Sequence, residues 1–344
     1  MFLTPLGQSI IDERPGADGP GSIQEKRQKR WETLLLAQAR LAVPMVRCSI
    51  MIVDCHTHMG LAADDVDAAE EAAMDEAVDA CIVLASAEGP SEEVNKKLAV
   101  YVGKHADRMV GFAAVEPDKD KAILKNPKSI EEKLGLKGVV LHCCARGLHP
   151  THTDAMRFYE SAQELELPVF FHNTGDALGP EAILEFAQPY MLDEIAREFP
   201  ELKIIVGSMG VPFVQQTLFV VARHKNVYAD LTIKPSRVWQ TYNMVVAAHE
   251  NGIMDKLLFG SGFPAGNAGQ CIETLLGFNM LLADTNLPTV PRGSIRNIIE
   301  RDTLGVLGIR DHGIKPPERK TEEIAEPESA DVRAEEEEKV DTDV

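Results

Sequence analysis

Short apolar runs alternate with helical patterns between residues 51 and 310. The runs are rich in Val, Ile, Leu and Phe, and the stretches between them repeat apolar residues at steps of three and four. Eight predicted strands cover residues 50–54, 80–86, 109–115, 136–142, 168–172, 203–208, 226–231 and 256–261. The clearest helical patterns cover residues 65–78, 91–105, 154–166, 191–199 and 237–250. Strands that alternate with helices predict repeated βα units and a parallel sheet.

Eight βα units within residues 51–310 predict an α/β fold of the (β/α)₈ TIM-barrel type. A doubly wound open sheet is the competing fold, but no Gly-rich dinucleotide fingerprint follows the first strand. In a TIM barrel the functional residues lie at the carboxyl ends of the strands. These ends are therefore where candidate chemistry is sought.

Two flanking regions differ from the barrel. Residues 1–50 contain Gly and Pro and then a charged helical pattern, unlike the rest of the chain. They are either an N-terminal extension or the result of a misassigned start codon upstream of Met51. Residues 311–344 form an acidic tail, with 12 acidic and 4 basic residues from residue 317 onward. We expect this tail to be disordered, because it cannot bury enough apolar surface to offset its chain entropy.

Charge and composition narrow the class of partner. The formal net charge of −19 disfavours nucleic acid, which requires a basic surface. No apolar run is long enough to span a membrane, and no secretory signal is evident. The six cysteines show no CxxC spacing, which favours reduced thiols in the cytoplasm. We expect a soluble cytoplasmic protein that binds a small-molecule substrate, without a nucleic-acid or membrane partner. A homodimer is one option for its assembly, and the sequence does not determine the oligomeric state.

Three histidines at predicted strand ends form a candidate metal site. His56 and His58 are two residues apart at the first strand, so in an extended chain both imidazoles face the same way. His172 ends the fifth strand, where an apolar run gives way to polar residues. Three imidazoles can bind zinc and leave a position open for an activated water. A buried histidine satisfied by backbone carbonyls is the alternative for His172.

Several stretches, in order along the chain, resemble one family. They include "VDCHTH", "GVVLHCCARGLHP", "LPVFFHNTG", "LDEIAREFPELKIIVGSMG" and "LLFGSGFPAGN". From Met51 to Ile309 the chain resembles the amidohydrolase superfamily, and within it the amidohydrolase-related family that includes aminocarboxymuconate semialdehyde decarboxylase. The resemblance implies a metal-dependent hydrolase or nonoxidative decarboxylase acting on a small carboxylated or cyclic substrate. It also implies that His56, His58 and His172 bind one divalent metal ion, with zinc expected.

Two positions depart from that family's pattern. The family usually has a histidine at the end of strand six, where this chain has Ser208, and an aspartate at the end of strand eight, where it has Gly262. Some relatives have a bridging lysine on strand four, where Val140 stands, so a binuclear site is not expected. Glycine can neither bind a metal nor accept a proton through a side chain, so the usual hydrolytic base is missing.

Other residues are candidates to supply the missing chemistry. Asp230 and Asp176 are candidate bases, although an aspartate at a strand end also serves as a helix cap or turn former. Three further residues are candidate substrate contacts, namely His142, Asn173 and Ser208, and His142 is also a catalytic candidate. Asp54 is expected to hydrogen-bond a ligand imidazole or a neighbouring loop.

Cys143 and Cys144 follow strand four and could supply a soft metal ligand, but we favour packing as small buried residues. The residues at positions 208 and 262 also support a second hypothesis, in which the barrel has lost its catalytic activity and acts as a binding or regulatory protein. A purely structural role is the third hypothesis.

Overall fold

The computed structural model describes residues 51–59, 77–172, 179–282, 285–310 and 312–315. All described residues belong to one unit of the chain, Ser49–Val344. The predicted N-terminal extension, nearly all of the predicted acidic tail and most of the helical pattern at 65–78 lie outside the described residues.

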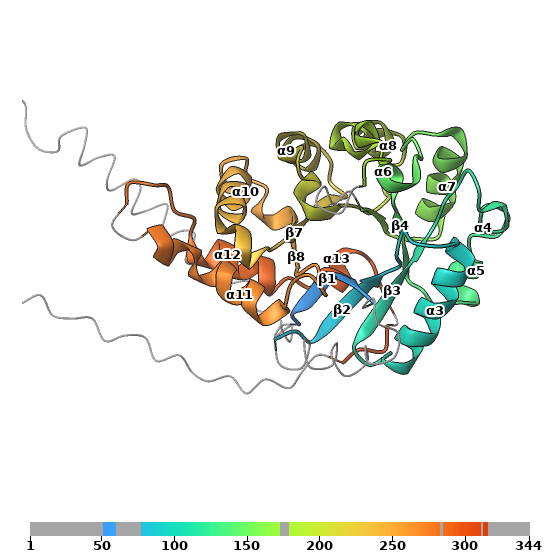
Figure 1. The fold of residues 1–344 in the computed structure, drawn as a ribbon, viewed down its shortest axis with the longest axis horizontal. Coiled ribbons are helices and arrows are strands. Elements are labelled where there is room, and N and C mark those ends of the chain that lie inside the picture. The colour runs from blue at the N-terminus through green and yellow to red at the C-terminus, as the bar shows by residue number, and fades with distance from the viewer. Residues whose placement is uncertain (1–50, 60–76, 173–178, 283–284, 311, 316–344) are drawn as a thin grey trace, which may run out of the picture. The chain divides into compact units, whose positions relative to one another are not determined.

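Eight parallel strands follow one another around a barrel in chain order, so every strand lies beside its sequence neighbour (Figure 1). Each strand predicted from the sequence is present, and the (β/α)₈ barrel prediction is confirmed. The strands are β1 (Val53–His58), β2 (Ala80–Leu84), β3 (Met109–Ala114), β4 (Gly138–Leu141), β5 (Val169–Phe171), β6 (Ile204–Val206), β7 (Val227–Thr232) and β8 (Leu257–Gly260).

The strands form because helices cover the outer face of the barrel while side chains fill its interior. A strand buried on both faces reads as a continuous apolar run rather than an alternating one. The sequences GVVL in β4, VFF in β5 and IIV in β6 are of this kind, and every residue in them is buried.

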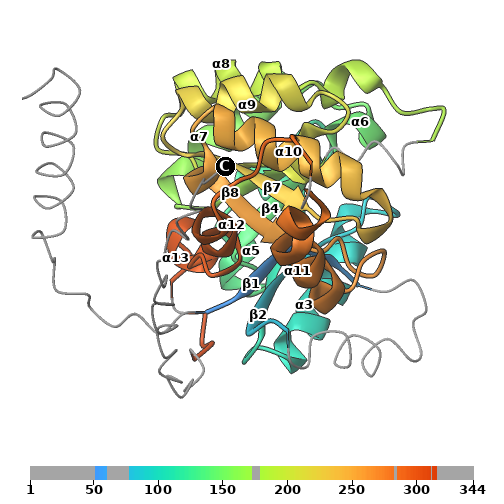
Figure 2. The same ribbon diagram turned by 90° about the vertical axis from the view of Figure 1, so that its left-hand side faces the viewer.

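Helices lie outside the ring of strands in both views (Figures 1 and 2). Four of them confirm predicted helical patterns, namely α3 (Ser91–Lys104), α7 (Thr153–Glu164), α8 (Leu192–Glu198) and α10 (Val238–Glu250). In α3 the residues Val94, Leu98 and Tyr101 are buried at the expected helical spacing. The α-helices are α3 (Ser91–Lys104), α4 (Lys121–Lys125), α5 (Ser129–Glu132), α6 (Cys143–Arg146), α7 (Thr153–Glu164), α8 (Leu192–Glu198), α9 (Val214–Arg223), α10 (Val238–Glu250), α11 (Ala268–Gly277), α12 (Arg292–Ile299) and α13 (Thr303–Val306).

Short 3₁₀ helices occupy several of the connections between strands and helices. They are η1 (Leu184–Ala187), η2 (Pro189–Met191), η3 (Gly207–Gly210), η4 (Pro235–Arg237), η5 (Met254–Lys256) and η6 (Phe278–Leu282). Within the described part of the chain, no helix combines the length and apolar character that a membrane crossing requires.

The segment that follows β8 meets β1 and joins the two ends of the sheet. Thr57 forms a parallel bridge with Phe263, and the His58 amide donates to the Phe263 carbonyl at 2.9 Å. The Gly262 amide donates to the His56 carbonyl, also at 2.9 Å. These bonds hold the turn after strand eight directly against the two histidines of strand one.

The first strand differs from the prediction in its position. The sequence pattern predicts residues 50–54, whereas β1 covers Val53–His58 and includes both histidines. The register between β1 and β2 shifts between Asp54 and Thr57, which marks a bulge. A search for apolar runs misses this strand, because its sequence "DCHTH" is mostly polar. His56 and His58 face the histidine cluster, whereas Val53 and Cys55 pack in the hydrophobic core.

Candidate metal centre

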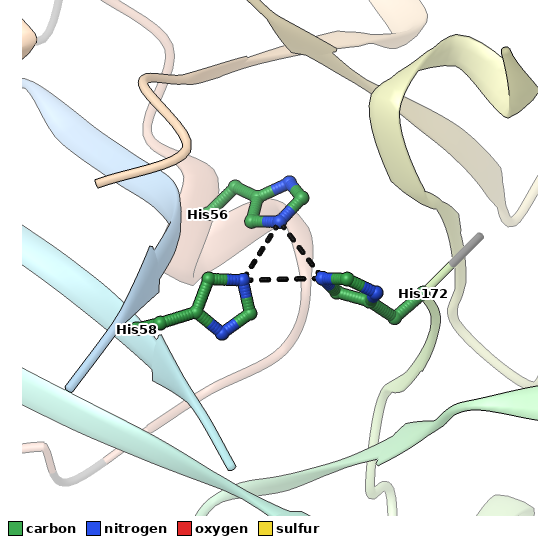
Figure 3. A group of neighbouring side chains, drawn as sticks. All are labelled: His56, His58 and His172. Atoms are coloured by element: carbon green, nitrogen blue, oxygen red, sulfur yellow. Dashed lines mark hydrogen bonds between the residues drawn. The ribbon is translucent and has the colours of Figure 1, made fainter. Parts of the chain in front are cut away.

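Three histidine side chains converge at the mouth of the barrel (Figure 3). His56 and His58 extend from β1, and His172 directly follows β5. The Nε2 atom of His56 lies 3.2 Å from Nε2 of His58 and 3.3 Å from Nε2 of His172, and the last two Nε2 atoms are 3.1 Å apart. The sequence prediction that these three residues come together is therefore matched by the geometry.

The spacing of the three nitrogens fits a single metal ion. Tetrahedral coordination with bonds of about 2.0–2.1 Å places ligand nitrogens roughly 3.4 Å apart, close to the separations seen here. Within the described residues, His56, His58 and His172 are the group of metal-binding side chains that can share one ion. The donor set thus fits a divalent cation that prefers imidazole nitrogen.

The orientation of the His56 ring is fixed from behind by β7. Its Nδ1 atom lies 2.5 Å from Oδ2 of Asp230 and 2.9 Å from Oγ1 of Thr232. The Asp230 carboxylate also accepts hydrogen bonds from the Ser208 amide at 2.9 Å and from the Thr232 hydroxyl at 2.7 Å. Because the Nδ1–H group donates a hydrogen bond to the carboxylate and keeps its proton, the lone pair of His56 lies on Nε2, which faces the other two histidines.

Gly260, at the end of β8, makes this pairing possible. A Cβ atom at that position would lie 2.9 Å from the Cβ of His56 and would collide with the Asp230 carboxylate. Only a residue without a side chain leaves both groups room to meet.

Burial keeps the other two ligands neutral. It lowers the pKa of His58 from 6.5 to about 3, with the neighbouring histidines His56 and His142 adding to the shift. The pKa of His172 is likewise held well below 6.5, first by burial and then by the neighbouring imidazoles. A neutral imidazole has a free lone pair, so both rings are ready to bind a cation near neutral pH.

His142 directly follows β4 and adds a fourth imidazole beside the cluster. Its ring centroid lies 4.7 Å from that of His172, and its Nε2 atom donates to the Ala85 carbonyl at 2.9 Å. Burial lowers its pKa to about 4, so the ring is neutral at pH 7 and carries its lone pair on Nδ1. The structure places this candidate residue next to a ligand but outside the group of three.

Asp54 is buried beneath the cluster, where it links β1 to the segment after β8. Its Oδ1 atom accepts from the His56 amide at 3.1 Å and from the Ser261 amide at 3.0 Å. Burial raises its pKa to about 6. The sequence interpretation of Asp54 as a partner of a neighbouring loop agrees with these contacts.

Ser208, a candidate substrate contact, lies in η3 with a left-handed backbone, at φ 48°. Its hydroxyl is 3.0 Å from the Thr232 hydroxyl, and its amide donates to Asp230. Such a conformation is costly for a residue other than glycine and persists where its surroundings impose it. The contacts of Ser208 therefore support the carboxylate behind His56.

Two further functional positions, Thr232 and Gly260, were not identified from the sequence. Thr232 lies two residues after Asp230 in β7, so both side chains point to the same face. With Asp230 as a candidate residue, this two-residue spacing would have been enough to predict that Thr232 faces the same site. Gly260 offered no signal without knowledge of which side chains meet beside it.

Four of the candidates from the sequence remain. Asn173 and Asp176 fall outside the described residues. Cys143 and Cys144 are both buried in α6, and burial raises the pKa of Cys143 to about 12. Both cysteines remain outside the histidine group, in agreement with packing as small buried residues.

The fold and the histidine cluster define a TIM-barrel protein of the metal-dependent hydrolase type. The chain belongs to the Amidohydrolase family, whose sequence model matches residues 53–270. No curated protein shows a significant sequence match.

Solved structures share this fold at low sequence identity. A 5-carboxyvanillate decarboxylase from Sphingomonas paucimobilis is 13% identical, with a TM-score of 0.55 over 76% of this chain and 100% of its own. A probable 2-pyrone-4,6-dicarboxylic acid hydrolase from Acinetobacter baumannii, with citric acid bound, is 15% identical, with a TM-score of 0.54 over 75% and 100%. A dihydroxybenzoic acid decarboxylase from Polaromonas, with manganese and 2-nitroresorcinol bound, is 17% identical, with a TM-score of 0.54 over 76% and 97%.

Proposed function

We propose that this protein is a metal-dependent hydrolase or nonoxidative decarboxylase that acts on a small carboxylated or cyclic substrate. The observation that carries the proposal is the convergence of three Nε2 atoms, each 3.1–3.3 Å from the other two. Family membership and the structural neighbours, which include decarboxylases and a hydrolase, support it. Free, buried cysteines among the described residues support a reducing, cytoplasmic location.

A single ion, with zinc as the first candidate, fits the described residues. Three imidazole nitrogens are a common set for catalytic zinc, which keeps one position open. Val140, buried in β4, offers no ligand for a second ion. A bound divalent cation would act as a Lewis acid and lower the pKa of a bound water. The Polaromonas neighbour contains manganese, so metal analysis must decide between the two.

The chain's own residues orient this site in two ways. Asp230 and Thr232 hold His56 in the tautomer that presents Nε2 to the cation. His142, neutral and beside His172, places a hydrogen-bond acceptor at the rim of the cluster, where a substrate hydroxyl can donate to it.

An aspartate at the end of strand eight, the base expected from the family resemblance, does not supply the catalytic proton transfer in this proposal. Gly262 has no side chain, and Oδ2 of Asp230 already accepts from His56, Ser208 and Thr232. Asp230 is therefore better suited to position His56 than to take a proton from water. Asp176 remains the candidate base that the sequence offers after strand five.

A binding or regulatory protein without turnover is the second candidate. The observation that favours it is the commitment of Asp230 to the back of His56, together with a glycine at position 262. In this function the cation would be held and a ligand bound, with no bond broken.

Turnover decides between the two candidates. The zinc- and manganese-loaded proteins are incubated with 2,6-dihydroxybenzoate, 5-carboxyvanillate and 2-pyrone-4,6-dicarboxylate, and carbon dioxide release and ring opening are measured. We expect metal-dependent conversion of at least one compound, removed by chelation. Ligand binding without conversion of any compound supports the binding protein instead.

Replacement of Asp230 by Asn is expected to weaken metal binding. The substitution keeps the shape of the side chain but removes the charge that holds the Nδ1 proton of His56. Loss of such a partner typically costs about 10- to 100-fold in metal affinity. The dissociation constant is measured by competition with a chromophoric chelator.

A second Asp–His pair provides the control for this substitution. Asp193 lies 2.7 Å from Nε2 of His224, and neither residue belongs to the histidine cluster. Asp193→Asn should leave metal affinity unchanged. Equal affinities in Asp230→Asn and the parent protein would show that the carboxylate does not support the ligand.

A further inference from the structure

Three large apolar side chains are exposed on α10 and on the residues that follow α11. Trp239 in α10 is 61% exposed, Met280 in η6 is 79% exposed and Leu287 is 42% exposed. We call these three residues the Trp239 patch. The helices α10 and α11 lie on the same side of the barrel in both views (Figures 1 and 2). Tryptophan and methionine are enriched in protein interfaces, so this surface is a candidate for an interaction.

Buried contacts beneath the patch hold it in place. The Trp239 ring stacks on Tyr242, with the ring centroids 5.1 Å apart and the planes at 23°. Tyr242 is buried, and its ring lies 5.9 Å from that of Phe278, the first residue of η6. Its hydroxyl donates to the Pro288 carbonyl at 3.0 Å. Tyr242 thus ties α10 to both segments that carry the other two patch residues, and a surface fixed in this way loses little conformational freedom on binding.

The charge along these segments differs from that of the whole chain. Two copies of a chain with a net charge of −19 repel each other, unless they meet where acidic side chains are few. Residues 231–249 contain no Asp or Glu, and residues 274–292 contain one, Asp284, although 54 of the 344 residues are acidic. A basic partner would instead be attracted to the acidic surface elsewhere. The segments that carry the patch are therefore suited to a second, equally charged copy.

We propose that the Trp239 patch is the interface of a homodimer, in which the patch of one copy packs on the same patch of a second copy. A two-fold interface brings identical residues together, so a charged centre would repel itself whereas an apolar centre is self-complementary. An exposed tryptophan within a patch of this kind is expected to contribute much of the binding energy. The interface does not require the metal centre, so it goes beyond the proposed function.

Sedimentation equilibrium of the full-length protein tests this interface. We expect a concentration-dependent species with twice the chain mass of 37.7 kDa. Trp239→Glu should weaken the dimer by about 100-fold or more, because one substitution introduces a charge on both sides of a two-fold interface. Val100→Glu is the matched control, because Val100 is 64% exposed on α3, away from α10 in both views (Figures 1 and 2). It adds the same charge and should leave the dissociation constant within about threefold.

Salt provides a second measurement. Raising the NaCl concentration from about 0.02 M to about 0.5 M should strengthen the parent dimer, because salt screens the repulsion between two equally charged copies. A dimer that weakens at high salt would instead be held by ion pairs, which contradicts an apolar interface.

Two further results would overturn the proposal. One is a parent protein that stays monomeric at all concentrations, whether the patch then contacts another protein or another segment of this chain. The other is a Trp239→Glu variant that dimerises as tightly as the parent, which would place the interface elsewhere. If Trp239→Glu does not fold, Met280→Glu replaces it with the same expected loss, because Met280 is the most exposed residue of the patch.

Discussion

Combined replacement of His58 and His172 by alanine is expected to abolish metal binding and leave the barrel folded. Two of three ligands are lost, and His56 alone cannot hold a divalent ion at near-stoichiometric occupancy. The variant keeps His56, which is buried and bonded to Asp230. The variant therefore removes the site and spares the network behind it.

Elemental analysis of the purified proteins measures this effect. The parent should contain close to one equivalent of zinc, manganese or iron, and the double variant almost none, with matching circular dichroism spectra. His149→Ala is the control, because this histidine packs on Phe186 outside the cluster. Equal metal contents in the parent and the double variant would place the metal elsewhere.

The fold was readable from the sequence because burial dominates the barrel strands. Runs such as those of β4, β5 and β6 are apolar throughout, since both faces of each strand are covered. Prediction from apolar runs misplaced β1, because most residues of this strand are polar and its two histidines line the site. The bulge between Asp54 and Thr57 had no sequence signal of its own.

The three histidine ligands could be predicted from the sequence, whereas the residues that hold them in place could not. His56 and His58 share a face through simple strand alternation, and His172 marks an abrupt end to an apolar run. The pairing of His56 with Asp230 joins residues 174 positions apart and depends on the space that Gly260 leaves. Such contacts follow from barrel closure, so a pattern along the chain does not reveal them.

The metal-free protein is expected to lose stability steeply between pH 6.5 and pH 4. The pKa of His58 falls from 6.5 to about 3 on folding, and that of His142 to about 4. Below pH 6.5 the unfolded chain therefore binds protons that the folded protein does not, so acid favours unfolding. Above pH 6.5 this contribution to stability is fully present.

The size of the loss follows from the same shifts. Each of these two histidines costs roughly 2 kcal/mol at pH 5 relative to pH 7.5, and His172, shifted in the same direction, adds to the loss. Asp54 acts in the opposite sense, because its pKa is raised from 3.8 to about 6 and its protonation favours the folded state by roughly 1 kcal/mol at pH 5. His58 and His142 together outweigh the carboxyl, so their net effect is destabilisation on the order of 3 kcal/mol, and His172 acts in the same direction.

Urea unfolding of chelator-treated protein at pH 7.5 and pH 5.0 measures this difference. His142→Asn should recover roughly 2 kcal/mol of the loss at pH 5.0, because one buried imidazole no longer resists protonation. His249→Asn is the matched control, since this histidine is exposed on α10, and it should leave the difference between the two pH values unchanged. A metal-free protein equally stable at both values would mean that the imidazoles are not held neutral by burial, and the lone pairs assigned to the cation would then need another explanation.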